Sequence, residues 1–240
     1  MSSVDPGAVY ELTRLAVIAT VSALSDEQFD TVVPATPAWR VRDVLSHVVG
    51  LGADLNAQRF PDADDVGGAA WALRQVASRG DTAIDDILAE WSREAPTFEE
   101  GLRVFGYEEG SHFVADLHAH HQDIRGAIGL PPGDDELTVG VALDHYLGFL
   151  DQMITSASWG TLVVVAVASE GVEERSLGGV GPHHARMRGS AFEVLRCCSA
   201  RRSARQIREL EWHGDVDALL SLLQASFTGG YALPEADLVE

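Results

Sequence analysis

Residues 108–130 read EEGSHFVADLHAHHQDIRGAIGL, and this stretch decides the fold of the N-terminal half of the chain. Apolar residues recur along it at helical spacing, which predicts one amphipathic helix. The expected buried face carries Phe113, Leu117, Ile124, Ala127 and Ile128. Asp116 and His120 lie on or beside that face, stacked about one turn apart. The pattern therefore points a carboxylate and an imidazole toward the core of a helical bundle.

An earlier stretch, residues 41–55, has the same character. Its expected buried face carries Val44, Leu45, Val48, Leu51 and Leu55. His47 lies at the edge of that face. Polar groups that face a core cost several kcal/mol unless they are compensated, and a divalent metal ion is a common compensation. Two ligands four residues apart on one helix and a third from another helix are typical of catalytic zinc sites, which keep one position open.

Two simpler interpretations stay open at this stage. A single histidine on an apolar face, such as His47, is most often a hydrogen-bonded core residue. Asp116 and His120 also fit an ordinary pair at the edge of a helix. The convergence of all three residues favours the metal site.

Several segments resemble a known family. Residues 36–47, TPAWRVRDVLSH, resemble the opening motif of the mycothiol-dependent maleylpyruvate isomerase family, which belongs to the DinB-like metal-binding bundles. Residues 116–129, DLHAHHQDIRGAIG, resemble its second signature: an acidic ligand, a histidine four residues later, then Asp-Ile-Arg and a glycine. Residues 189–196 and 201–203 resemble its sterol-carrier-like second domain. The resemblance covers nearly the whole chain.

The resemblance implies that His47, Asp116 and His120 are the metal ligands. Two positions depart from the family pattern. The acidic ligand is usually glutamate, and Asp116 is one methylene shorter, so the metal must lie closer to its helix or bind more weakly. The residue after the tryptophan is usually Ser or Thr, which caps the next helix; Arg40 cannot do this.

The resemblance also implies a reaction. A divalent metal, with zinc expected, would bind mycothiol, the low-molecular-weight thiol of actinobacteria, and deprotonate it. The thiolate would add to a double bond conjugated to a carbonyl, and rotation followed by elimination would isomerise an unsaturated keto-dicarboxylate from cis to trans. Arg201 and Arg202 match a Gly-Arg-type motif and are the candidate catalytic arginines that contact thiol or substrate carboxylate. The alternatives are a mycothiol S-transferase in detoxification, and a metal-binding module without catalysis.

The composition narrows the choice of function. The 240 residues carry a net charge of −20, and all 17 basic residues are arginines. The lack of lysine excludes Schiff-base catalysis and a P-loop. The acidic surface argues against nucleic acid and anionic membranes as partners. The partner that the resemblance implies is a small anionic or electrophilic substrate. Eight arginines fall in residues 175–208, either as an ion-paired surface or as binding groups for carboxylates.

The two cysteines, Cys197 and Cys198, are adjacent, so a disulfide framework is not expected and a reducing cytoplasm is the expected compartment. The N-terminal segment lacks the pattern of a signal peptide. The apolar run of residues 161–168 is too short to span a bilayer.

The remaining pattern predicts an α+β protein with two domains. Residues 1–157 are expected to form an up-and-down helical bundle, which the resemblance implies is DinB-like, and residues 158–240 a small α+β domain. We expect a monomer or a homodimer. The expected helices cover residues 6–24, 41–55, 85–105, 108–130, 139–156, 191–199 and 216–227, with Pro96 expected to kink or split the third. The expected strands cover residues 161–168, 173–177, 184–188 and 210–213.

Overall fold

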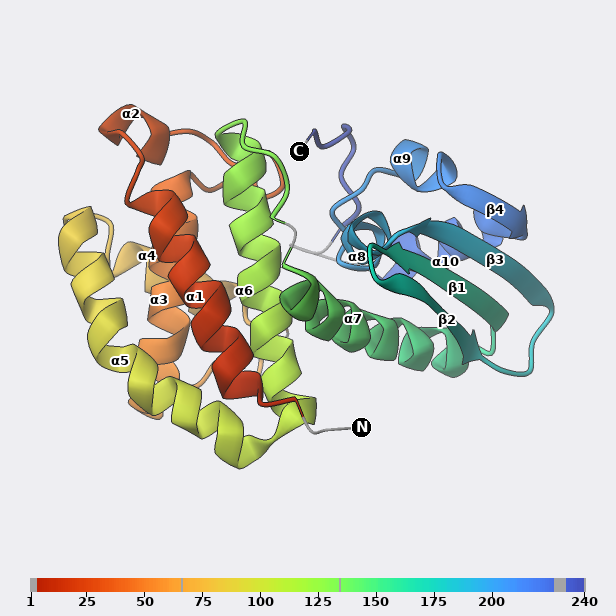
Figure 1. Ribbon diagram of the computed structural model, residues 1–240, viewed down its shortest axis with the longest axis horizontal. Coiled ribbons are helices and arrows are strands. Elements are labelled where there is room, and N and C mark those ends of the chain that lie inside the picture. The colour runs from red at the N-terminus through yellow and green to blue at the C-terminus, as the bar shows by residue number, and fades with distance from the viewer. Residues whose placement is uncertain (1–3, 66, 134, 227–231, 240) are drawn as a thin grey trace. The chain divides into compact units, whose positions relative to one another are not determined.

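The computed structural model describes residues 4–65, 67–133, 135–226 and 232–239. These residues form two compact units, one up to residue 133 and one spanning residues 134–239. Helices make up the first unit, and the second combines helices with a sheet (Figure 1). The expected α+β class, with a helical N-terminal part and a small mixed C-terminal part, is confirmed.

Four long helices form the N-terminal bundle. α1 packs against α5 and α6, and α3 packs against the same two helices, so the four close around one core (Figure 1). Two short helices, α2 and α4, connect them. The helices of this unit are α1 (Pro6–Val21), α2 (Asp26–Phe29), α3 (Val41–Asn56), α4 (Ala69–Ala77), α5 (Ile84–Phe105) and α6 (Tyr107–Ala127).

The starts of α1 and α3 show how the sequence sets the helix ends. The Asp5 side chain accepts a hydrogen bond from the Ala8 amide at 3.1 Å, with Pro6 in the first turn. At α3 the residue before the helix is Arg40, which offers no acceptor in its side chain. The carboxylate of Asp43 instead accepts from the Arg40 amide at 2.9 Å. Asp43 thus supplies the half of a capping box that accepts from the residue before the helix, but it does not replace the Ser or Thr of the family pattern, which would accept from an amide of the first turn.

The bundle differs from the expectation in two details. α5 is one continuous helix with Pro96 inside it, so the proline does not split the helix, although the ribbon of α5 is bent (Figure 1). α2 and α4 were not among the expected helices, which cover residues 6–24, 41–55 and 85–105 in this part of the chain. α4 has nine residues and α2 has four, too few for a clear apolar period.

Close contact between α1 and α5 depends on Gly7. A Cβ at this position would lie 2.3 Å from the Glu99 carbonyl oxygen, which belongs to a backbone that cannot rotate away. We expect Gly7→Ala to lower the free energy of unfolding by about 1–3 kcal/mol, the usual cost of overpacking. Urea denaturation of the two proteins measures the change.

Gly101 in α5 provides the matched control, because a Cβ there meets nothing within 4 Å. Gly101→Ala should raise stability by up to about 1 kcal/mol, since alanine favours the helix. If both substitutions stabilise the protein, α1 and α5 do not approach each other at Gly7 as described.

His121 in α6 should make the stability of the bundle depend on pH. Its ring is buried, its Nε2 lies 2.9 Å from the Thr20 hydroxyl, and burial lowers its pKa from 6.5 to about 4. In the unfolded chain His121 therefore binds a proton below about pH 6.5, whereas in the folded chain it binds one only below about pH 4. Stability should fall between these values, and His121→Gln should remove up to about 3 kcal/mol of the loss. Unfolding curves of both proteins at pH 7 and pH 4.5 test this.

A four-stranded sheet forms the centre of the second unit, in the order β2-β1-β3-β4. β1 pairs antiparallel with β2 and parallel with β3, and β4 pairs antiparallel with β3. α7 and α8 pack against each other and against the sheet. The elements are α7 (Glu136–Ser156), β1 (Gly160–Ala168), β2 (Gly171–Gly178), β3 (His183–Ser190), α8 (Ala191–Cys198), α9 (Ala204–Arg208), β4 (Glu211–Gly214) and α10 (Val216–Ser226).

The division between the units differs from the expected boundary after residue 157. α7 had been assigned to the bundle because of its helical apolar pattern. Its buried side, with Leu143, Leu147, Leu150 and Ile154, lies in the second unit, where α7 contacts α8, β1 and β2. An amphipathic pattern shows that a helix buries one face, but it does not show which element that face packs against.

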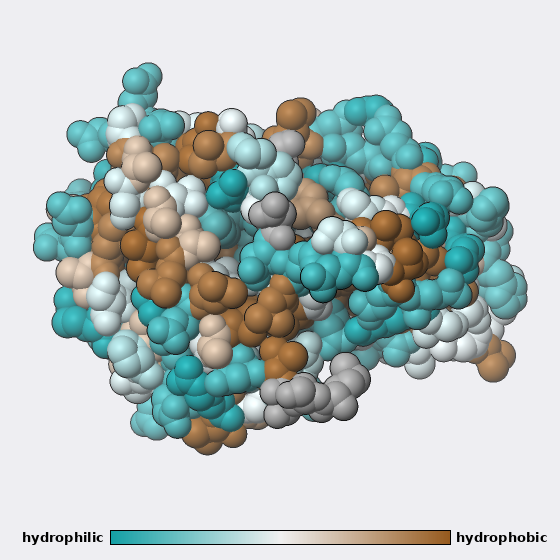
Figure 2. Space-filling model, in the orientation of Figure 1, coloured by the Kyte–Doolittle hydropathy of each residue, from teal (hydrophilic) through white to brown (hydrophobic). Residues whose placement is uncertain are grey.

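Hydrophilic side chains cover much of the molecular face in Figure 2, in keeping with the charge of −20. Hydrophobic side chains gather over α1, where Leu12 and Leu15 are about half exposed (Figure 2). Within the described residues, every helix is too short or too polar to cross a lipid bilayer.

Candidate metal centre

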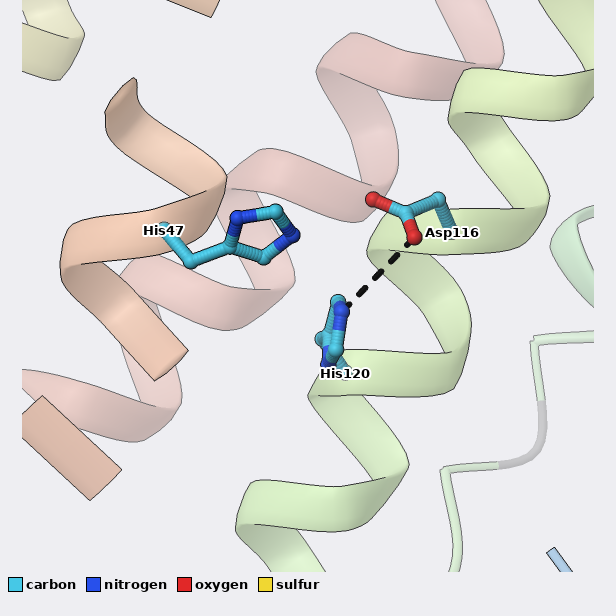
Figure 3. Close-up of side chains that lie close together, drawn as sticks. All are labelled: His47, Asp116 and His120. Atoms are coloured by element: carbon cyan, nitrogen blue, oxygen red, sulfur yellow. Dashed lines mark ion pairs between the residues drawn. The ribbon is translucent and has the colours of Figure 1, made fainter. Parts of the chain in front are cut away.

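Three side chains from two helices of the bundle converge on one point. His47 extends from α3, and Asp116 and His120 extend from successive turns of α6 (Figure 3). One ligand atom from each residue lies within 4.8 Å of those from the other two. The structure therefore brings together the three residues that the sequence predicts as metal ligands.

The spacing within this group suits a small divalent ion. His120 Nε2 lies 3.6 Å from Asp116 Oδ1, and two ligand atoms about 2.0 Å from a tetrahedral zinc ion lie roughly 3.3 Å apart. His47 and His120 are buried, and Asp116 is partly buried. Two imidazoles and a carboxylate form a mixed nitrogen and oxygen donor set, which zinc accepts. The residues present therefore fit a divalent metal ion.

Both histidines have polar neighbours on the side of the ring away from this point. The His47 Nδ1 atom lies 2.8 Å from the Gln75 side-chain oxygen, and the His120 Nδ1 atom lies 3.4 Å from a carboxylate oxygen of Asp123. Metal-binding histidines commonly have such outer partners, which fix the ring and leave the other nitrogen for the ion. The sequence predicts neither partner. Asp123 appears in it only as the aspartate of the Asp-Ile-Arg signature, and no sequence pattern marks Gln75.

Burial sets the charge state of His47. Loss of hydration and the neighbouring His120 lower the pKa of His47 from 6.5 to about 4, although Asp116 and Gln75 act in the opposite direction. The ring is therefore neutral at pH 7. A neutral imidazole has a lone pair to give to a metal, so His47 needs no deprotonation before it binds one.

Trp39 lies beside the two histidines. Its ring centroid lies 5.1 Å from that of His47 and 6.3 Å from that of His120. A bridge between Val32 and Arg40 holds the loop that carries the tryptophan, and the Arg40 guanidinium bonds to Asp43 at the start of α3. The loop thus places an aromatic side chain next to the candidate ligands.

The candidate catalytic arginines belong to the second unit, between α8 and α9. Both are buried. Arg201 donates to the Ser199 carbonyl, and Arg202 bonds through two nitrogens to the Glu193 carboxylate at 2.8 Å. Their predicted contact with a ligand stays a prediction.

Other arginines of the residue 175–208 segment have acidic partners, as the simpler interpretation of that cluster expects. Arg186 pairs with Glu174 across the sheet, and Arg208 pairs with Asp217.

The cysteines have no part in the candidate centre. Cys197 and Cys198 are free thiols in α8 of the second unit. Burial raises the pKa of Cys198 to about 12 and raises that of Cys197 as well. Both stay protonated at neutral pH, as expected for structural rather than reactive cysteines.

Comparison with known families confirms the resemblance that the sequence motifs indicate. Residues 12–125 match the mycothiol maleylpyruvate isomerase N-terminal domain. These residues therefore form a domain of this family. The matched range contains His47, Asp116 and His120. A search of curated proteins found no match to the chain.

Two solved structures share the fold of the maleylpyruvate isomerase family with this chain. A histidine-to-alanine mutant of the mycothiol-dependent maleylpyruvate isomerase is 12% identical, with a TM-score of 0.58, and the likeness covers 86% of this chain and 91% of the mutant. A second structure of mycothiol-dependent maleylpyruvate isomerase is 13% identical, with a TM-score of 0.56 and coverages of 82% and 88%. Both units thus follow the architecture of this enzyme.

Proposed function

We propose that this protein is a metal- and mycothiol-dependent enzyme of the maleylpyruvate isomerase type. His47, Asp116 and His120 would hold one divalent ion, with zinc expected from the donor set. The substrate would be an unsaturated keto-dicarboxylate that isomerises from cis to trans. The observation that carries the proposal is the convergence of these three side chains within 4.8 Å, in a segment that matches the N-terminal domain of the mycothiol maleylpyruvate isomerases.

The number of protein ligands matters for the chemistry. Three ligands leave one tetrahedral position open, as in catalytic zinc sites. An ion held there would lower the pKa of a thiol bound at the open position, so that it reacts as a thiolate at neutral pH. The protein's own groups would fix that ion: His47 is neutral without losing a proton, and Asp116 supplies the negative charge.

The thiol must come from outside the chain. Cys197 and Cys198 are the only cysteines, and both are buried and held protonated. A free low-molecular-weight thiol fits this arrangement, because its small size lets it reach a buried ion. The reducing cytoplasm inferred from the unpaired cysteines would keep such a thiol available.

Turnover of a maleyl-type keto-dicarboxylate tests the proposal. The zinc-loaded full-length protein should isomerise this substrate only when mycothiol is added. The double bond should change from cis to trans, and the thiol should be recovered unchanged. NMR spectroscopy of the product follows both changes. Turnover without any thiol would contradict the proposal.

The S-transferase alternative differs in the fate of the thiol, which would stay bonded to an electrophile instead of being released. Mass spectrometry of the products distinguishes a stable thioether from an isomer. The third alternative, a binding module, predicts bound metal with neither product, and the shorter Asp116 is the residue that favours it.

A role for Arg201 in binding carboxylates would extend the proposal to the second unit. Arg201→Met should raise KM for the dicarboxylate with a smaller change in kcat, because an arginine that only binds substrate affects mainly ground-state affinity. Arg202→Met is the comparison, since it breaks the paired contact with Glu193 and should lower the melting temperature. Steady-state kinetics and thermal unfolding of both variants separate these effects. Unchanged KM in Arg201→Met would remove Arg201 from the site.

A further inference from the structure

α4 has an unusual buried face. Of its nine residues, only Gln75 is buried, with 1% of its surface exposed, whereas Leu73 is 57% exposed. A helix on a protein surface normally buries apolar side chains. Burying an amide costs free energy unless its polar atoms are hydrogen-bonded. The contacts of Gln75 therefore indicate what α4 does for the bundle.

Both ends of the Gln75 amide have partners. Its oxygen lies 2.8 Å from His47 Nδ1, and its nitrogen donates to Asp54 Oδ2 at 3.3 Å. Asp54 also accepts from Arg59 at 2.8 Å and is a carboxylate, so it cannot donate. Rotating the amide by 180° would place oxygen against oxygen. Asp54 therefore fixes which end of Gln75 faces His47.

This orientation determines the hydrogen on the His47 ring. Because the amide oxygen can only accept, the Nδ1 atom of His47 must carry the hydrogen. The lone pair of the neutral ring then lies on Nε2. Asp123 lies beside Nδ1 of the second histidine, His120, at 3.4 Å. Each histidine of the centre thus has a side-chain oxygen near Nδ1, at hydrogen-bond distance for His47 and as a longer contact without a hydrogen bond for His120.

The packing around Gln75 leaves little freedom. A Cβ at Gly50 on α3 would lie 2.7 Å from the Gln75 Cβ and 2.6 Å from the Arg79 guanidinium. Arg79 donates to the Gln75 carbonyl and pairs with Glu90 of α5, which holds the end of α4 against the bundle. Glycine at position 50 thus allows the close approach that brings the amide to His47.

We propose that Gln75 is a positioning residue, which fixes His47 as the Nδ1–H tautomer and so presents its Nε2 lone pair to a divalent ion. α4 serves to bring this amide to the ligand. The inference rests on the metal site of the proposed function. It goes beyond that function because it assigns a role to a residue that contacts neither metal nor substrate.

The tautomer of His47 can be observed without any metal. In full-length protein labelled with ¹⁵N-histidine and stripped of metal, long-range proton–nitrogen NMR spectra at pH 7 should show the His47 ring with hydrogen on Nδ1. Gln75→Met keeps the size of the side chain and removes the acceptor. It should shift His47 toward the Nε2–H tautomer, which an unconstrained neutral imidazole favours. An unchanged tautomer in a folded Gln75→Met protein would overturn the proposal.

Metal affinity provides the second readout. Gln75→Met should weaken Co²⁺ binding, measured by competition with a chelator, by roughly 10- to 100-fold, as loss of an outer partner of a ligand typically does. The double variant Gln75→Glu with Asp54→Asn restores an acceptor for His47 and a donor behind it, and should recover most of the affinity. Leu73→Ala, on the exposed side of α4, is the control and should bind Co²⁺ as the unmodified protein does.

The two measurements distinguish a failure of the proposed metal site from a failure of the proposed role of Gln75. If the unmodified protein binds no Co²⁺, the metal site of the proposed function fails, while the NMR spectra still decide the role of Gln75. If the unmodified protein binds Co²⁺ and Gln75→Met binds it equally well, the proposed function stands and the inference on Gln75 is wrong.

Discussion

Replacing His120 with alanine should abolish metal binding. The purified protein is expected to hold about one divalent ion per chain, and His120 supplies one of the three candidate ligands found among the described residues. Its loss leaves His47 and Asp116 on different helices, without the neighbour that completes the set. The fall in affinity should exceed the roughly 10- to 100-fold effect of losing an outer partner. Elemental analysis of dialysed protein measures the metal content.

His112→Ala is the matched control for this experiment. His112 lies two turns earlier on the same helix, α6, and its side chain is exposed. The variant removes an imidazole without touching the candidate centre, so it should keep its metal. If His120→Ala retains one ion per chain, or if His112→Ala loses it, the ligand assignment is wrong.

The second large effect is expected from Asp116→Asn. The amide has nearly the same shape as the carboxylate but lacks its charge, and a neutral oxygen binds a divalent ion more weakly. Thiol-dependent kcat/KM at a fixed zinc concentration should fall about 100-fold or more, which corresponds to about 2.7 kcal/mol of lost stabilisation. Glu109→Gln, on the exposed first turn of the same helix, changes the net charge equally and should leave kcat/KM unaltered. Equal kcat/KM in the Asp116→Asn and unmodified proteins would contradict a ligand role for Asp116.

The ligands on α6 could be predicted because helix geometry alone determines their relation. Residues four apart on an α-helix lie on one side, so Asp116 and His120 had to be neighbours once the helix formed. Predicting the position of His47 beside them required more information, because it depends on how α3 packs against α6. The apolar face of α3 and the family motif together supplied that step.

Gln75 could not be predicted for the opposite reason. It follows its partner His47 by 28 residues, and its helix has only nine, with one buried side chain. No local period marks such a residue, because its burial depends on the space above Gly50 and on the partners that its amide finds there. The packing partner of α7 could not be predicted either, because an apolar helix face can pack against the bundle or against the sheet.

Binding of a thiol to Co²⁺-substituted protein tests the central claim most directly, namely that His47, Asp116 and His120 hold an ion with one position open to an external thiol. The cobalt form of the full-length protein should gain a sulfur-to-cobalt charge-transfer band in the near ultraviolet when mycothiol is added. The band should saturate at one thiol per metal and be absent from His120→Ala. A protein that binds Co²⁺ at one ion per chain but develops no such band with thiol would contradict the claim.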